Sequence, residues 1–447
     1  MTNKELILLF VGVFSLIHCL YFKRENIIFL TILLLPIGVL FETKMIPIGL
    51  TGILIWSIWF SFIIKHNNIG INIINWNVIS PKLMWLYVFI FLGAIIGIIN
   101  VDSLDTYTKD SQFTQVFRLT LSLLTIVFFI KILVNYRDDY IFQKKLKYIF
   151  TLSIFLHLMP LIAEKIGILN SLVALSYTTF EDSLIQTEVS RFSGLFGDYE
   201  LIIDYCLMIV ALTISNFILY KGNKLISILT ILATLFMGIQ SGTRSFLIIL
   251  PLFFISFYLL SWIFSIYRRK FTVLFLTFSG LVYLFVMKFS SQIIVFERLF
   301  EAKQIYSSTG SLNEASNRHF GKSVNSIMEN VMIIGNGSLA FDQINGDEMV
   351  SHNLLMHTYS RYGITGLFLL LVLFFKSIIS SLKCIIKTKS KIQKIEGIIL
   401  VSLLISLLIQ EMKISAIRYQ HSMLIYTFLF ILVYYYLYQF KTKKVNG

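Results

Sequence analysis

Apolar runs of about 20 residues recur along most of this chain, and they constrain its fold more than any other feature. A helical run of this length matches the hydrocarbon core of a bilayer. The sequence is 57% hydrophobic and only 14% charged, and a soluble domain of 447 residues could not bury that much apolar surface. The runs are continuous rather than alternating, which excludes a transmembrane barrel.

We therefore expect an all-α, polytopic integral membrane protein with one membrane domain over residues 1–447 and one large outer-face loop. The predicted number of transmembrane helices is about 12 or 13, because several apolar runs are short. The predicted spans are 5–22, 27–41, 46–64, 83–99, 116–134, 148–169, 201–219, 225–239, 245–266, 271–288, 364–382, 395–410 and 422–440.

The segments between the spans alternate in charge. One alternating set, from Lys23 to the tail at Lys441–Lys444, holds 21 Lys and Arg against 3 Asp and Glu, whereas the other set holds 11 against 17. The positive-inside rule places the first set, and with it the C-terminus, in the cytoplasm. The net charge of +14 is thus mostly a matter of topology, and it does not indicate a nucleic-acid partner.

This orientation places the two longest connections, 170–200 and 289–363, on the outer side. Polar backbone must leave the lipid, so a membrane protein with such a segment usually works there. ATP is absent from that side of the membrane. A substrate that reacts at these loops must therefore arrive already activated.

Few basic residues lie on the outer side, and three of them stand in distinctive short motifs: Arg191, Arg244 and Arg318. A guanidinium group offers a planar fork that matches phosphate oxygens, so three of them together would bind a pyrophosphate and stabilise it as a leaving group. His352 is a candidate to move a proton at neutral pH.

Each of these residues also has a purely structural interpretation. Arg191 could form solvated ion pairs with nearby acids, and Arg318 could lie on a solvated helix face. Arg244 could reach from a helix end to the membrane interface, and His352 could cap the following helix. The residue types alone leave these alternatives open.

Other ionisable residues carry weaker signals. Asp204 lies within a predicted span close to the outer boundary, and it could share a cavity with Arg191, Glu411 and Arg418. His18 and His157 lie within predicted spans and far from the outer loops, so packing or a local hydrogen bond is expected for them. The three cysteines have no metal-ligand spacing, and neither a metal nor a cofactor is predicted.

The order of the motifs resembles that of the O-antigen polymerase and ligase superfamily, the Wzy-type membrane glycosyltransferases. The matching segments are Arg-x-x-Gly at 191–194, Ser-Gly-Thr-Arg at 241–244, Asn-Arg at 317–318, Gly-Asn-Gly at 335–337, His-Asn at 352–353 and Gly-x-x-Gly at 363–366. The family often has an Asn-Pro-Asn-like turn after the first motif, where this chain has Asp198-Tyr199-Glu200.

The resemblance implies transfer of a glycan from undecaprenyl pyrophosphate to a sugar hydroxyl at the outer face of the bacterial inner (plasma) membrane. Lipid-linked donor and acceptor glycans would be the partners, with a chain-length regulator protein possible. The three arginines would bind the pyrophosphate, and His352 would act as the base or orient the acceptor. The predicted substrate-binding residues are Asn353, Asp198, Asn317 and Tyr359.

Four functions can be compared with these sequence features: polymerase, ligase, transporter, and sensor or scaffold. A polymerase joins lipid-linked repeat units, whereas a ligase transfers the glycan to a lipid A core. A transporter of the lipid-linked unit would show internal repeats, broken helices and polar residues near mid-membrane. This sequence shows no convincing repeat, and charged residues well inside its spans are few. A sensor or scaffold would need a folded cytoplasmic domain. We favour the polymerase over the ligase because the chain is divergent outside the motifs, as expected of enzymes that each fit their own repeat unit.

Overall fold

The computed structural model describes most of the apolar segments of the chain. The described ranges are 3–36, 48–66, 106–166, 177–182, 187–192, 201–220, 222–241, 245–264, 354–413 and 420–445, together with single residues between them such as Leu195, Thr243 and Ile333. The chain divides into two compact units. The first comprises residues 1–153, 321–377 and 415–435, and the second comprises residues 154–320, 378–414 and 436–447.

Within the described residues, five helices are long and apolar enough to cross a membrane by length and composition: Leu201–Leu219, Phe246–Ile263, Gly363–Lys387, Lys391–Met412 and Met423–Phe440. Four shorter apolar helices, Glu5–Tyr21, Gly49–Lys65, Thr120–Val134 and Lys224–Gln240, coincide with further predicted spans. The predicted spans 83–99 and 271–288 lie wholly or almost wholly outside the described residues.

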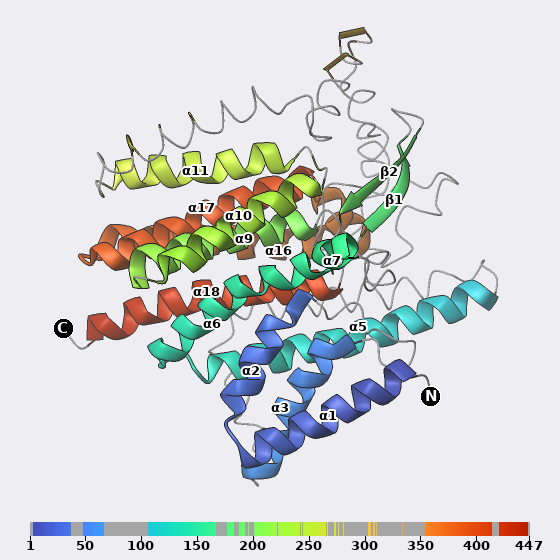
Figure 1. Ribbon diagram of the computed structural model, residues 1–447. Coiled ribbons are helices and arrows are strands. Elements are labelled where there is room, and N and C mark those ends of the chain that lie inside the picture. The colour runs from blue at the N-terminus through green and yellow to red at the C-terminus, as the bar shows by residue number, and fades with distance from the viewer. Residues whose placement is uncertain are drawn as a thin grey trace. The chain divides into compact units, whose positions relative to one another are not determined.

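Helix α3 is at the centre of the N-terminal helices of the first unit, where it contacts α1, α2 and α5 (Figure 1). The indole N–H of Trp56 donates to Thr125 Oγ1 at 2.8 Å, and the ring of Trp59 stacks on Phe128 with centroids 4.6 Å apart. Because a buried indole N–H needs a partner, this bond fixes α3 against α5. The helices of this unit are α1 (Asn3–Tyr21), α2 (Arg24–Leu33), α3 (Gly49–His66), α5 (Thr106–Val134), α6 (Tyr140–Leu152), and those parts of α16 (Leu354–Lys387) and α18 (Gln420–Val445) that belong to it.

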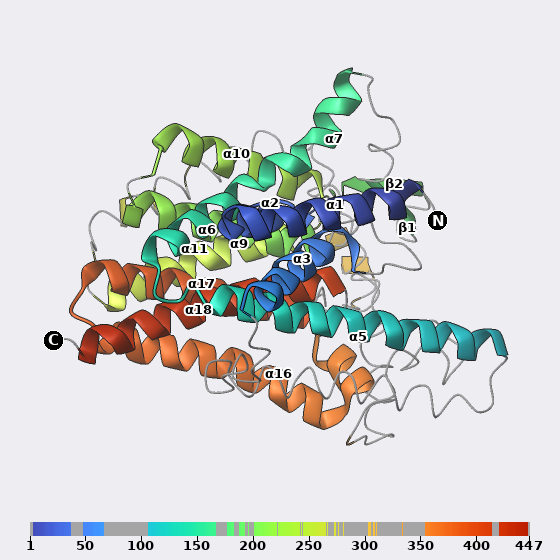
Figure 2. The same ribbon diagram turned by 90° about the horizontal axis from the view of Figure 1, so that it is seen from below.

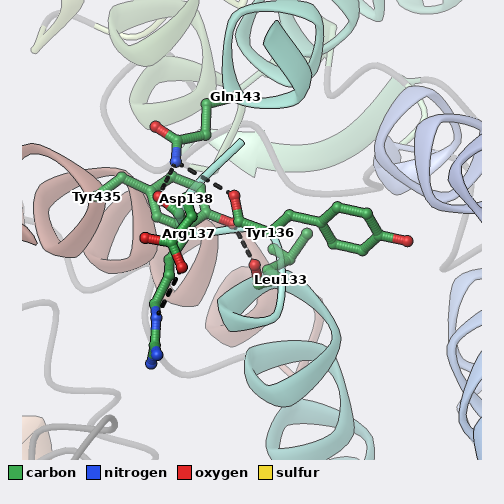
Figure 3. A network of polar contacts seen from close by, with 6 residues as sticks. All are labelled: Leu133, Tyr136, Arg137, Asp138, Gln143 and Tyr435. Atoms are coloured by element: carbon green, nitrogen blue, oxygen red, sulfur yellow. Dashed lines mark hydrogen bonds and ion pairs between the residues drawn. The ribbon is translucent and has the colours of Figure 1, made fainter. Parts of the chain in front are cut away.

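The turn between α5 and α6 is closed by a network of polar contacts (Figure 3). Gln143 Nε2 donates to the carbonyl oxygens of Tyr136 and Arg137, at 3.3 and 2.6 Å. The hydroxyl of Tyr435 in α18 donates to the carbonyl oxygen of Leu133. The last carbonyls of a helix lack partners within it, so these side chains complete the end of α5. Burial raises the pKa of the Tyr136 phenol, and the nearby Glu25 raises it further.

Helix α9 is the central helix of the second unit. Every residue from Leu201 to Thr213 is buried, and α9 contacts α10, α11 and α17, which lie beside it in Figure 1. A helix that is apolar all round is typical of a protein core or a membrane span. The elements of this unit are α7 (Ile154–Ile166), β1 (Tyr177–Asp182), β2 (Thr187–Phe192), α9 (Leu201–Tyr220), α10 (Lys224–Gln240), α11 (Phe246–Ile263) and α17 (Lys391–Lys413), with the remaining parts of α16 and α18.

Short connections make the neighbouring helices of this unit antiparallel. Only residues 221–223 separate α9 from α10, and the Asn223 side chain caps α10 by accepting from the backbone N–H groups of Leu225 and Ile226. The C-terminal end of α10 therefore lies beside the N-terminal end of α9. The strand β2 contacts α10 as well, so the hairpin formed by β1 and β2 belongs to this second unit.

Two local predictions differ from the structure. The predicted span 148–169 is divided at Ser153 into α6 and α7, because the Ser153 hydroxyl and N–H both bond to the last turn of α6. The predicted loop 170–200 contains the antiparallel pair β1–β2, so the described chain is helical, as predicted, with one added hairpin. Alternation of Thr, Glu, Val and Phe in short strands is easily missed among long apolar helices.

Candidate functional site

Two of the predicted site residues, Arg191 and Tyr359, lie in described elements. Arg191 is in β2, where its backbone pairs with Thr178 of β1, while its side chain lies outside the described part. Tyr359 lies in α16, where it is 8% exposed, so it is a buried helical residue and not a loop residue. Its predicted role in binding stays a prediction. The other predicted residues lie outside the described residues: His352, Asn353, Arg318, Asn317, Arg244 and Asp198.

The turn between α10 and α11 carries the Ser-Gly-Thr-Arg motif, and local hydrogen bonds fix it. The Ser241 hydroxyl donates to the carbonyl oxygen of Gly238 at 2.7 Å and accepts from the backbone N–H of Thr243 at 3.4 Å. The backbone N–H of Phe246 donates to the carbonyl oxygen of Thr243. Ser241, Thr243 and Ser245 are all buried. The residues on either side of Arg244 in the sequence, Thr243 and Ser245, are therefore both held in the protein interior.

Gly238 allows the two helices to meet closely at this turn. A β-carbon at position 238 would overlap the ring of Phe246, which lies directly over the glycine. The ring is itself buried, so it could not move aside without opening the interface. A glycine in the last turn of α10 is thus a packing requirement of the motif turn.

Helix α17 reaches the same turn from a distant part of the sequence. Gln410 Nε2 donates to Ser245 Oγ at 3.1 Å, and both residues are buried. Ser245 occupies the N-cap position of α11, yet its side chain makes no capping hydrogen bond to the helix. Its hydroxyl contacts α17 instead, which places the C-terminal end of α17 beside the motif turn.

The Arg-x-x-Gly segment is tied to the second unit by a buried histidine. The backbone N–H of Leu195 donates to His157 Nδ1 at 3.0 Å, and the His157 ring lies 5.0 Å from the ring of Tyr205, measured between centroids. His157 is fully buried in α7. The expectation that His157 lies far from the outer loops is therefore wrong, because it holds the segment that follows Arg191.

Buried polar residues gather at this end of the second unit. We call it the polar end and define it by His157, Asp204, Ser241, Ser245, Gln410 and Glu411, all buried. Asp204 lies in the first turn of α9, which adjoins the end of α10, and Glu411 follows Gln410 in α17. The predicted association of Asp204 and Glu411 with Arg191 stays a prediction. Arg418, predicted beside them, lies outside the described residues.

In the first unit, the Gly-x-x-Gly segment breaks helix α16. Gly363 has φ 69° and ψ −174°, a conformation open only to glycine, and the helix changes direction there (Figure 2). The hydroxyl of Thr365 donates to the carbonyl oxygen of Ile333 at 2.7 Å. Ile333 lies two residues before Gly335, the first residue of the Gly-Asn-Gly segment at 335–337. Two further segments of the family resemblance are thus joined by this hydrogen bond.

Sequence reasoning missed two residues that hold these motifs, His157 and Gln410. Both lie within apolar helices. Gln410 is the last residue of the predicted span 395–410 and is followed by Glu411, and this neighbour was the signal that could have drawn attention to it. Among the described residues, no group of three His, Cys, Asp or Glu side chains is placed to hold a metal ion.

No protein-family model matches this chain, and no curated protein is significantly similar to it.

Proposed function

We propose that this chain is a polytopic membrane glycosyltransferase that polymerises glycan repeat units carried on undecaprenyl pyrophosphate at the outer face of the bacterial plasma membrane. A hydroxyl of one lipid-linked unit attacks the anomeric carbon of another. The new glycosidic bond forms as the bond from that carbon to the pyrophosphate oxygen breaks. Undecaprenyl pyrophosphate leaves, and the proton of the attacking hydroxyl passes to His352.

The membrane part of the proposal rests on the apolar helices. The candidate spans reach the length needed for a hydrocarbon core, and helix α11 keeps apolar side chains such as Leu259 and Trp262 on its exposed surface. A large exposed apolar surface is costly in water and favourable in lipid. The alternation of charge between spans gives the orientation, with the motif segments outside.

One observation carries the proposed activity: segments of the resemblance that are far apart in sequence adjoin each other within each unit. In the second unit, β2 with Arg191 contacts α10, and the motif turn that follows α10 in the sequence contains Arg244. In the first unit, Thr365 is bonded to Ile333. Motif residues that serve one site must converge in space, so this pairing supports a common function rather than chance matches.

The buried acids of the polar end fit a site built from arginines. Asp204 and Glu411 are fully buried, and a buried carboxylate is stable only when cations or several hydrogen-bond donors surround it. Carboxylates beside the arginines would hold the guanidinium planes in one orientation. Oriented guanidinium groups neutralise the negative charge that grows on the departing pyrophosphate, and this is the main demand of the reaction.

The proposal is tested with purified protein in liposomes and lipid-linked repeat units extracted from a strain that lacks the gene. We expect a ladder of glycans on the lipid carrier, together with release of undecaprenyl pyrophosphate. A ligase would give no ladder in this mixture, because its lipid A core acceptor is absent. Repeat units that stay single while the protein is correctly inserted would contradict the polymerase function.

A further inference from the structure

We infer that Gln410 is a positioning residue of the proposed glycosyltransferase, which holds the motif turn at 241–245, and with it Arg244, against helix α17. The inference rests on the proposed function and deepens it. It assigns to α17 a part in the site that no motif of the sequence marks. Gln410 does not touch substrate in this account, and it acts through Ser245.

The contact is a long-range, buried hydrogen bond. Gln410 Nε2 lies 3.1 Å from Ser245 Oγ, across a separation of 165 residues in the sequence. The side chain of Gln410 is 1% exposed and that of Ser245 is 2% exposed. Such a bond, shielded from water, restrains the start of α11 more strongly than an exposed bond would. Arg244 is the residue immediately before Ser245, so a shift of this turn would move it.

The local structure explains why Ser245 is tied to α17 and not to its own helix. A serine that caps a helix usually has extended backbone, and its side chain then accepts from a backbone N–H of the first turn. Ser245 has helical backbone, with φ −63° and ψ −30°, and its side chain makes no capping bond. Its hydroxyl accepts from Gln410 instead, so this bond ties the start of α11 to α17.

Gln410 is also a costly residue for this position. Its Oε1 atom is buried and has no hydrogen-bond partner among the described residues. A buried carbonyl without a partner destabilises a protein, whereas an apolar side chain of similar size at the same place would not. The Nε2 atom of the same amide makes the link to the motif turn.

Positioning and a purely structural role predict different stabilities. If Gln410 served only folding, replacing both partners of the bond would lower stability and activity together. If it positions Arg244, the Gln410→Leu/Ser245→Ala double variant keeps the thermal stability of the wild type, because it leaves neither partner of this bond unpaired in the interior. The catalytic rate falls nevertheless, because the turn is no longer fixed to α17.

Ser406→Ala is the matched control. Ser406 lies one turn before Gln410 on the same face of α17, is fully buried, and its hydroxyl likewise has no partner among the described residues. Its hydroxyl makes no hydrogen bond to the motif turn in the part of the chain that is described, so its removal should leave both stability and rate unchanged.

The experiment measures the initial rate of polymer formation in liposomes at several concentrations of the extracted lipid-linked repeat unit, with thermal unfolding measured in parallel. We expect Gln410→Leu and Ser245→Ala each to lower kcat by about tenfold to a hundredfold, with KM little changed, because a small misplacement of a catalytic group has an effect of this size. The double variant should be no worse than either single variant, because both act through one bond.

The outcomes distinguish the two proposals. If the wild type forms polymer and Gln410→Leu keeps its kcat, the positioning role is overturned and the polymerase function stands. A loss of kcat in the double variant that follows a loss of its thermal stability, or an equal loss of kcat in Ser406→Ala, also overturns the positioning role. If the wild type forms no polymer, the proposed function fails, and the role of Gln410 falls with it.

Discussion

His157 illustrates how a single buried side chain can control a motif in another element. Its Nδ1 accepts the backbone N–H of Leu195, and this requires an imidazole that carries no proton on that nitrogen. A buried backbone N–H without an acceptor costs about 1–3 kcal/mol. The position of the Arg-x-x-Gly segment therefore depends on a residue that lies more than 30 positions before it in the sequence.

We predict that His157→Phe lowers the polymerisation rate by about tenfold or more. Phenylalanine still places an aromatic ring at this position, but it has no nitrogen to accept the backbone N–H of Leu195. His18→Phe is the matched control, since His18 also lies in an apolar helix but stacks on Phe22, with ring centroids 4.9 Å apart. The rate is measured in liposomes at equal protein content. Equal rates for the two variants would show that the His157 bond does not serve the site.

Arg244 gives a second prediction at this scale. Arg244→Lys keeps the charge but removes the planar fork, so we expect its polymerisation rate to fall by about tenfold or more if the contact with phosphate is bidentate. The same liposome assay measures it. A fully active Arg244→Lys would favour the structural alternative, in which this side chain only reaches the membrane interface.

Some residues of the candidate site could be predicted from the sequence, and others could not. The arginines and His352 stood out because charged residues are rare in this chain and recur in short motifs. The residues that hold the motifs, His157 and Gln410, could not be found in this way, since their partners come from distant segments that only the fold brings together. Tyr359 was placed in a loop because the preceding segment is polar, yet it belongs to the buried side of a helix.

At the scale of elements, the break in α16 depends on one glycine. Gly363 adopts φ 69° with an extended ψ, and a side chain there costs about 1–3 kcal/mol of backbone strain. We predict that Gly363→Ala lowers both the thermal unfolding temperature and the polymerisation rate, because the helix would straighten or unfold locally and pull Thr365 away from Ile333.

Gly222→Ala is the control for this prediction. Gly222 lies in the connection between α9 and α10, and a β-carbon there would make only an ordinary contact, 3.4 Å from the carbonyl oxygen of Asn216. Both variants are compared by thermal unfolding in detergent and by rate in liposomes. A Gly363→Ala protein that matches Gly222→Ala in both would contradict the account of the kink.

The apolar runs predicted the positions of most described helices, because a span needs a long continuous apolar segment and little else imitates one. Their ends were predicted less well. Helix α5 begins at Thr106, ten residues before the predicted span, and α16 begins at Leu354 within the predicted loop 289–363. A helix can extend beyond its apolar run into polar residues, and hydropathy does not register this.

At the scale of the whole molecule, the proposed orientation depends on charge alone. We predict that Ser311→Cys reacts with a membrane-impermeant thiol reagent in intact cells, whereas Lys145→Cys in α6 reacts only after the cells are opened. The three native cysteines are all buried, so their background reaction should be small. Labelling of Lys145→Cys but not of Ser311→Cys in intact cells would reverse the topology.

Polymerisation of lipid-linked repeat units should be visible in the glycan that reaches the cell surface. A strain without the gene is complemented with the wild type, with Arg318→Ala, or with Lys322→Ala, a cation of the same predicted loop outside the motifs. On a glycan gel, we expect single repeat units in the deletion strain and with Arg318→Ala, and a full ladder with the other two. A full ladder in the deletion strain itself would contradict the polymerase function.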